Sequence, residues 1–315
     1  MCIRDRLKNS LSLIRPPKLN PGDKVGVVSP AGPVNKKQLQ NGLDVVSEMG
    51  FYPVVGKYVY SQSRFLAGTD SQRANDIMDM VRNPEIKAIF CARGGYGTNR
   101  VLEYLDAKVI RANAKIFVGS SDITLLLHYL YLHCGLLSFH GPMVAGSFGR
   151  SPMKQSRKQI KNILMGKPTL LNCRHAKVFS KGIATGKITG GCLTLLCRSL
   201  STSYEVQTRN RILIIEDVNE PLYKLDGMLW QLKAAGKFKG IRGIVFGEMI
   251  NCKPQKYSDG KFEDILDDLF PNPKIPIITH CPIGHGKEIW TLPFETQATL
   301  NASAKSLELK NCGVK

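Results

Sequence analysis

Hydrophobic and polar residues follow two alternating patterns along the first half of the chain. Short apolar runs, typical of buried strands, come before stretches that carry apolar residues on one helical face. The predicted strands cover residues 23–30, 51–59, 86–92 and 116–118, and the predicted helices cover residues 35–50, 71–83, 98–106 and 123–132. Strands and helices that alternate in this way predict a parallel sheet with helices on both faces.

The pattern weakens between residues 147 and 185, where basic, Ser, Gly and Pro residues replace the periodic stretches. We therefore predict a linker over residues 148–185, between an N-terminal α/β domain (16–147) and a C-terminal domain (186–315). The second half mixes short strands and helices, with strands expected at 211–220, 240–250 and 275–286 and helices at 224–236 and 262–270.

The N-terminal residues 1–15 are basic and lack a sustained apolar core, so we expect a disordered tail and no signal peptide. No run of eighteen apolar residues occurs, so no membrane span is predicted. The nine cysteines are odd in number and form no C-x-x-C pair, which indicates reduced thiols in a cytoplasmic protein.

The formal net charge of +19, from 44 Lys and Arg against 25 Asp and Glu, suggests anionic partners. The basic residues are spread along the chain, and the densest cluster, Lys154 to Lys161, has no interleaved aromatic residues. This distribution favours a basic cleft or a solvated basic face over a nucleic-acid site.

Three loops follow predicted strands of the first half: Ser29–Gly32, Arg93–Gly97 and Gly119–Asp122. Ligands of parallel sheets bind beyond the carboxyl ends of the strands, so these loops are candidates for a common site. In the second loop, the adjacent glycines of RGGYG would let backbone amides approach a phosphate or an oxyanion.

Two adjacent serines in the third loop, VGSSDIT, raise the possibility of a nucleophile at a strand-to-helix turn. Such an elbow has the pattern G-x-S-x-G, because the turn crowds the flanking residues. Ser121 has Gly119 at the required position before it but Ile123 after it, whereas Ser120 fits on neither side. Ser121 is the better candidate, and the alternative is a helix N-cap without catalysis.

A nucleophilic serine needs a base and an acid that orients the base. His140 (SFHGPM) and His285 (PIGHGK) both lie in Gly-containing loops after apolar runs, and the residues alone do not choose between them. For the acid, EDVNE offers Glu216, Asp217 and Glu220, of which Glu216 ends a buried strand and would need a partner there. A helix-start acid or a weak divalent-metal cluster is the alternative.

Six stretches of the chain stand in a recognisable order: LNPGDKVGVVSPAGPV, FLAGTDSQRANDIMDMVRNPEIKAIFCARGGYGTNRVLEYLD, VGSSDIT, FHGPM, IEDVNEPLYKLDGMLWQL and GHGKEIWTLP. Through them the chain, from about Pro16 to Leu309, resembles the LD-carboxypeptidase family, the muramoyl-tetrapeptide carboxypeptidases. The resemblance implies an α/β fold with an N-terminal flavodoxin-like parallel-sheet domain and a C-terminal β-rich α+β domain, the site between them, and usually a homodimer. It also implies a Ser-His-Glu triad of Ser121, His285 and Glu216, and so favours His285 over His140.

The activity implied by the resemblance is release of terminal D-alanine from cytoplasmic murein tetrapeptides during cell-wall recycling, without a metal or cofactor. We expect the backbone N–H groups of Asp122 and of Gly94 or Gly95 to hold the oxyanion. Arg93 is the candidate for the substrate's terminal carboxylate, or else a brace for its loop.

Two other functions stay open. One is the related self-immunity hydrolase activity on peptidyl-nucleotide antibiotics; the other is a non-catalytic protein that binds anions or nucleic acid. The chain departs from the family pattern at Ser120 (usually aromatic), Cys192 and Ile289 (usually asparagine), and Ser201 and Glu295 (usually glycine).

Overall fold

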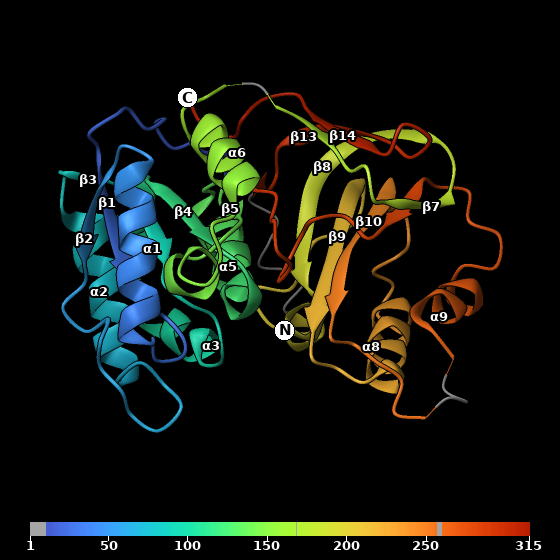
Figure 1. The fold of residues 1–315 in the computed structure, drawn as a ribbon, viewed down its shortest axis with the longest axis horizontal. Coiled ribbons are helices and arrows are strands. Elements are labelled where there is room, and N and C mark those ends of the chain that lie inside the picture. Colours follow the sequence, from blue (N-terminus) through green and yellow to red (C-terminus); the bar gives the residue numbers. More distant parts are fainter. Residues whose placement is uncertain (1–10, 168, 257–259) are drawn as a thin grey trace.

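The computed structural model describes residues 11–167, 169–256 and 260–315, which form two lobes, each built on a sheet (Figure 1). In the first sheet the order β2-β1-β3-β4-β5 is parallel throughout, as in flavodoxin-like folds, and β12 adds an antiparallel edge. Its strands are β1 (Lys24–Val28), β2 (Tyr52–Val55), β3 (Ile86–Cys91), β4 (Ile116–Gly119), β5 (Phe139–His140) and β12 (Leu292–Pro293).

The helices of the first lobe connect these strands and cover the sheet (Figure 1). Helix α2 begins at a capping box formed by Thr69 and Gln72, and α1 begins at Asn35, whose side chain accepts the Gln38 N–H. The helical segments are α1 (Lys36–Glu48), α2 (Asp70–Arg82), α3 (Thr98–Val101), η2 (Leu102–Tyr104), α4 (Ala107–Ala112), η3 (Ser121–Ile123), α5 (Thr124–Cys134) and η4 (Val144–Phe148).

The second sheet has the order β6-β14-β13-β8-β9-β10-β11-β7, with a parallel centre from β8 to β11 and antiparallel strands on both sides. These strands are β6 (Leu170–Asn172), β7 (Lys177–Ser180), β8 (Ile183–Cys192), β9 (Arg211–Val218), β10 (Gly243–Ile250), β11 (Ile277–Thr279), β13 (Gln297–Asn301) and β14 (Ser306–Leu309). The remaining helices are α6 (Lys154–Leu164), α7 (Leu193–Ser199), α8 (Leu222–Ala234) and α9 (Phe262–Leu269). The predicted fold class is thereby confirmed.

The segment predicted as a linker, residues 148–185, contains regular structure. It forms α6, which buries Ile160 and Ile163, and it supplies β6 and β7 to the two edges of the second sheet. The partners of these edge strands, β14 and β11, lie about a hundred residues or more along the chain, so local periodicity carries no signal for the pairing. Of the predicted tail, residues 1–10 lie outside the described residues, while Ile14 forms a parallel bridge with Leu136.

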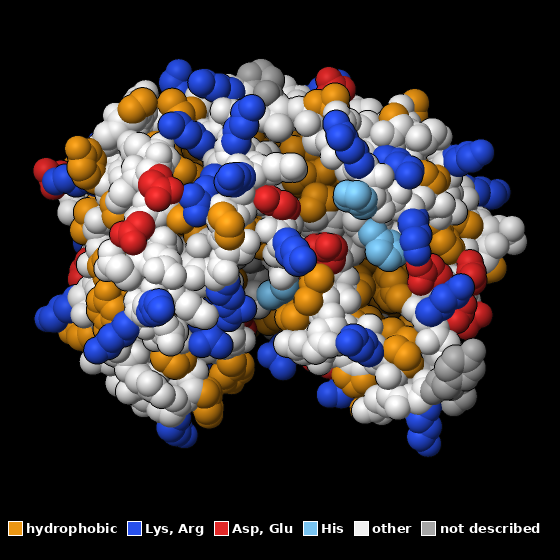
Figure 2. All heavy atoms as spheres, viewed as in Figure 1, with side chains coloured by type: hydrophobic (Ala, Val, Ile, Leu, Met, Phe, Trp, Pro, Cys, Tyr) orange, Lys and Arg blue, Asp and Glu red, His pale blue; other side chains and the backbone are white. Residues whose placement is uncertain are grey.

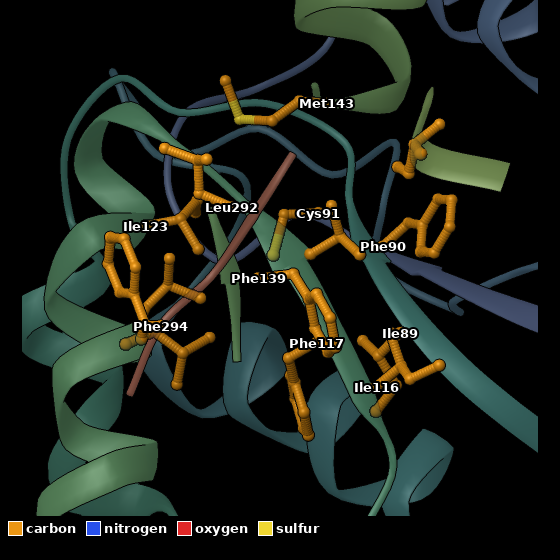
Figure 3. Close-up of a cluster of buried hydrophobic side chains, with 14 of the residues drawn as sticks. Ile89, Phe90, Cys91, Ile116, Phe117, Ile123, Phe139, Met143, Leu292 and Phe294 are labelled. Carbon is orange, nitrogen blue, oxygen red and sulfur yellow. The ribbon is translucent and has the colours of Figure 1, made fainter. Parts of the chain in front are cut away.

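The two halves of the chain are interwoven at the first sheet. Strand β12 comes from the C-terminal half, pairs with β5, and brings Leu292 and Phe294 to the core of the first lobe. Figure 3 shows both side chains beside Ile123, in a cluster that also contains Phe139 and core residues of β3 and β4. The β5–β12 pairing joins the two domains expected from the sequence. Their boundaries stay a prediction.

Basic side chains are spread over both lobes in the view of Figure 2, which also shows a notch between the lobes with Lys and Arg on either side of it. Within the described ranges, no helix is both long and apolar enough to cross a membrane.

Two positions at which the family resemblance leads us to expect glycine have a backbone conformation that favours glycine. Ser201 and Glu295 have φ angles of 63° and 62°, in the left-handed region that favours glycine. The Glu295 carboxylate forms a bidentate pair with Arg211, with N–O distances of 2.8 and 2.9 Å, and Arg211 also donates to the Tyr131 hydroxyl. A nearly buried ion pair therefore accompanies the unusual residue.

We expect Glu295→Ala to destabilise the protein by about 3 kcal/mol, because Arg211 would keep a largely buried charge without its partner. Thermal or urea unfolding of the purified variant measures this. Glu308→Ala, which removes the exposed pair with Lys310, is the matched control and should change stability little. Equal losses in both variants would contradict a special role for the buried pair.

Candidate active site

Ser121 lies on a sharp turn between β4 and α5. Ser120 is still extended, with φ of −149°, whereas Ser121 has φ of 60°, and the short helix η3 starts there. A non-glycine residue in this region is strained and is held in place only by its surroundings, as at a nucleophile elbow. Ser121 is partly exposed, but Ser120 is fully buried and its hydroxyl has no hydrogen-bond partner within the described chain. These differences favour Ser121 over Ser120 as the reactive residue.

The half-matched elbow pattern is explained by packing. A Cβ atom on Gly119 would lie 2.6 Å from Ile123 Cγ2, so the glycine leaves room for the isoleucine side chain. Ile123 in turn is fully buried in the core of the first lobe, where Figure 3 shows it beside Phe294. The turn therefore tolerates the large residue Ile123 two positions after Ser121, because Gly119, two positions before it, has no side chain to collide with it.

The RGGYG loop passes directly over Ser121. A Cβ atom on Gly94 would lie 2.8 Å from both Cβ and Oγ of Ser121 and 3.4 Å from the Asp122 nitrogen. The Gly94 carbonyl accepts a hydrogen bond of 3.1 Å from Gly32 N–H, and Gly95, with φ of 112°, lies against Gly32 as well. The three candidate loops thus meet at one edge of the sheet.

The Asp122 side chain is committed to structure. Its Oδ2 accepts the Thr98 N–H at 2.8 Å, at the start of α3, and the residue is buried. Burial raises the pKa of this carboxyl, and the hydrogen bonds from Thr98 act in the opposite direction. Asp122 therefore ties the RGGYG loop to the elbow, and only its backbone N–H is a candidate oxyanion donor.

Arg93 braces its own loop. Its Nη1 donates to the Pro33 carbonyl oxygen at 2.7 Å, and its side chain is half-buried. Its expected role at the substrate carboxylate remains a prediction, but one of its donors is already used.

Glu216 and His285 form the central pair of the site in the second lobe. Glu216 is fully buried near the end of β9, and its Oε2 lies 2.8 Å from His285 Nδ1. The loop that carries His285 approaches closely because Gly284 lacks a side chain: with φ of 105°, its Cβ would lie 2.2 Å from Glu216 Oε2. The glycine before His285 is therefore required for the hydrogen bond.

The pair is electrostatically coupled. Burial alone would raise the pKa of Glu216, but His285 and His140 outweigh it and lower the pKa to about 2. Burial alone would lower the pKa of His285, but the charge and hydrogen bond of Glu216 outweigh it and raise the pKa. Because an ionised carboxylate only accepts hydrogen bonds, His285 carries its proton on Nδ1, and Nε2 of the neutral ring is free to act as a base.

His140, the alternative base, sits on the other side of the same carboxylate. Its Nε2 is 3.8 Å from Glu216 Oε1, beyond hydrogen-bond reach, and its ring stacks on Phe294. His140 is fully buried, while the His285 side chain is 20% exposed. The geometry thus favours His285 as the base, in agreement with the family resemblance.

The other acids of EDVNE have separate partners. Asp217 is buried and accepts hydrogen bonds from the backbone N–H and hydroxyl of Thr194 at the start of α7, and Glu220 pairs with Lys224. Across the described ranges, no group of three or more His, Cys, Asp or Glu side chains is placed to hold a metal ion.

The nucleophile candidate and the Glu216–His285 pair come from different lobes, and α5 and β8 join them. The Cys192 N–H donates to Thr124 Oγ1 at 3.3 Å, and His128 Nε2 lies 2.9 Å from the Gly190 carbonyl oxygen. Thr124 comes three residues after Ser121, and Cys192 pairs in register with Glu216. The two parts of the site therefore lie at one junction between the lobes.

A pH dependence follows from this pair. Only neutral His285 can accept a proton, so we expect kcat/KM to fall with acidification through a pKa above the ordinary histidine value of about 6.5. In Glu216→Gln the stabilising charge is gone, so the acid limb of any residual activity should move to lower pH. The pH–rate profiles of both proteins test this. If the acid limb lies at the same pH in both, Glu216 does not raise the pKa of the base.

Comparison with known proteins shows the family to which the chain belongs. The family models for the LD-carboxypeptidase N-terminal and C-terminal domains match residues 25–141 and 185–300. A probable murein peptide carboxypeptidase of Bacillus subtilis is 35% identical over 305 residues, covering 95% of this chain and 96% of its own. The microcin C7 self-immunity protein MccF of Escherichia coli is 25% identical, covering 91% and 93%. The crystal structure of a muramoyltetrapeptide carboxypeptidase from Oxalobacter formigenes has a TM-score of 0.79 and 28% identity, covering 91% and 97%.

Proposed function

The chain belongs to the LD-carboxypeptidase family, and we propose that it is a serine carboxypeptidase that releases terminal D-alanine from murein tetrapeptides. The observation that carries the proposal is the buried Glu216–His285 pair at the same lobe junction as a serine with φ of 60°. A base oriented by an acid and a serine on a strained turn is the arrangement that acyl transfer requires.

In the proposed mechanism, His285 Nε2 takes the hydroxyl proton of Ser121, whose Oγ attacks the carbonyl carbon of the L-residue. Glu216 stays ionised and stabilises the imidazolium. The backbone N–H groups of Asp122 and of Gly94 or Gly95 stabilise the oxyanion. His285 then gives its proton to the leaving amine, and the D-amino acid departs. A water molecule then gives a proton to His285 while its oxygen attacks the acyl carbon. The ester bond to Ser121 breaks, His285 returns the proton to Ser121 Oγ, and the shortened peptide leaves as a carboxylate.

We propose a cytoplasmic location and a homodimer as well. The eight cysteines of the described ranges are all free, which suits a reducing compartment. The homodimer rests on the family resemblance, and light scattering after size-exclusion chromatography tests it.

The proposed reaction predicts a requirement for the free C-terminal carboxylate. Converting it to an amide should lower kcat/KM at least roughly tenfold, because a hydrogen bond to a charged group contributes about 1.5–3 kcal/mol. The measurement is release of D-alanine or D-alaninamide from a defined tetrapeptide by the wild-type protein. Equal turnover of both forms would indicate an endopeptidase or amidase.

The second candidate is hydrolysis of peptidyl-nucleotide antibiotics, favoured by the similarity to the self-immunity protein of Escherichia coli. Both reactions would use the same three residues, so the site geometry does not separate them. Comparing kcat/KM for a murein tetrapeptide and for an aminoacyl nucleotide analogue does, and a clear preference for the nucleotide would replace the first proposal with the second.

A further inference from the structure

A pocket of about 330 Å³ lies between the lobes beside Asp122, the residue that follows the proposed nucleophile. Tyr96, Asn99 and Asp122 line it from the first lobe, and Leu195, Arg198 and Tyr204 line it from the second. Its walls, to which Leu125 also contributes, thus combine two aromatic rings, two leucine side chains and a cation. A pocket of this kind, lined by the residue that follows the proposed nucleophile, is suited to a polar end of a substrate.

Arg198 is the distinctive residue of this pocket. It lies in the last turn of α7, is exposed, and is the one Lys or Arg among the lining residues. Within the described ranges, its guanidinium forms no hydrogen bond or ion pair with the protein. It also borders a neighbouring pocket of about 610 Å³, where the acid, Glu220, is already paired with Lys224 at 3.6 Å. All five donors of Arg198 are therefore available to a ligand.

The charge of Arg198 reaches the catalytic region. Burial raises the pKa of Asp122, the hydrogen bonds from Thr98 oppose this rise, and the positive charge of Arg198 opposes it as well. Asp122 is the only carboxylate on the pocket wall, and its Oδ2 is held by Thr98. Arg93, the other candidate cation, already donates to Pro33. Arg198 is thus the freer of the two guanidinium groups.

We propose that Arg198 binds a carboxylate of the peptide substrate in this pocket and is a specificity-determining residue of the reaction. The planar guanidinium matches a carboxylate in two parallel hydrogen bonds, which gives orientation as well as affinity. The carboxylate comes from one of two sources: the terminal carboxyl group of the leaving residue, or a side-chain carboxyl on the residue before it. This inference deepens the proposed function and rests on it.

The test compares wild type, Arg198→Gln and Arg198→Lys on four tetrapeptides. The peptides have an acid or an amide at the C-terminus, and a carboxylate or a neutral group on the third side chain. Arg198→Gln should lose roughly tenfold to hundredfold in kcat/KM on peptides with the recognised carboxylate, and less than about twofold on matched peptides without it. Arg198→Lys should recover part of the loss. The carboxylate whose removal cancels the effect identifies the source.

Lys274→Gln is the matched control, since it removes one exposed positive charge ahead of β11, on a residue that lines neither pocket. It should leave kcat/KM unchanged on all four peptides. A uniform loss in Arg198→Gln, independent of the peptide's carboxylates, would overturn the proposal. It would mean that the cation only stabilises the C-terminal end of α7, which a lower melting temperature would accompany.

Binding separates this inference from the proposed function. Kd values for the same four peptides are measured with Ser121→Ala, with and without Arg198→Gln. If the wild type releases no D-amino acid, the proposed function fails. Arg198 is still supported as a carboxylate-binding residue if Arg198→Gln weakens binding only of the peptides that carry one of the two carboxylates. Equal affinities in both proteins, or no binding of any peptide, would refute the inference.

Discussion

Replacement of Ser121 with alanine is expected to abolish turnover, with kcat falling by roughly 10⁴-fold or more, because no other hydroxyl would replace the nucleophile. Ser121 has the strained φ of 60° and the partial exposure that an attacking serine needs. The measurement is release of D-alanine from a murein tetrapeptide, together with circular dichroism to establish that the variant is folded.

Ser120→Ala is the matched control. Ser120 is fully buried and its hydroxyl has no partner in the described chain, so its loss removes an unsatisfied polar group and should leave most activity. An inactive Ser120→Ala beside an active Ser121→Ala would show that the elbow has been assigned to the wrong serine.

Loss of either member of the Glu216–His285 pair should have the second largest effect. We expect His285→Ala and Glu216→Gln each to lower kcat by about 10³-fold or more, because the first removes the base and the second removes the charge that fixes its tautomer. Added to Ser121→Ala, neither substitution should cost much more, since residues of a triad act as a unit. Single-turnover and steady-state assays of the single and double variants measure the effects.

His140→Ala provides the comparison for this pair. His140 lies 3.8 Å from Glu216 and is fully buried, so its removal should affect stability or substrate affinity more than kcat. A folded but inactive His140→Ala, with activity retained in His285→Ala, would exchange the roles of the two histidines.

Much of the first lobe could be predicted from the sequence, because its strands and helices alternate and each has a local pattern. The buried run of β4 and the glycine two residues before Ser121 were enough to select this serine over Ser120. Edge strands such as β6 and β12 could not be predicted, since they have two or three residues and pair with distant partners.

The residues of the candidate site also differ in whether local sequence or only the fold points to them. Residue types and spacing by themselves favoured the candidate serine and the strand-end glutamate over their neighbours, because both preferences depend on adjacent residues in the chain, and left a non-catalytic alternative open for each. The choice between His285 and His140 needed the family resemblance, and its geometric support came only from the fold. Both histidines flank Glu216, but only the loop with Gly284 approaches to hydrogen-bond distance. Arg198 was not foreseen at all, because a pocket between two lobes brings together residues such as Tyr96 and Tyr204 that no local pattern connects. Local sequence determines which element a side chain belongs to, whereas packing between distant segments decides which side chains meet.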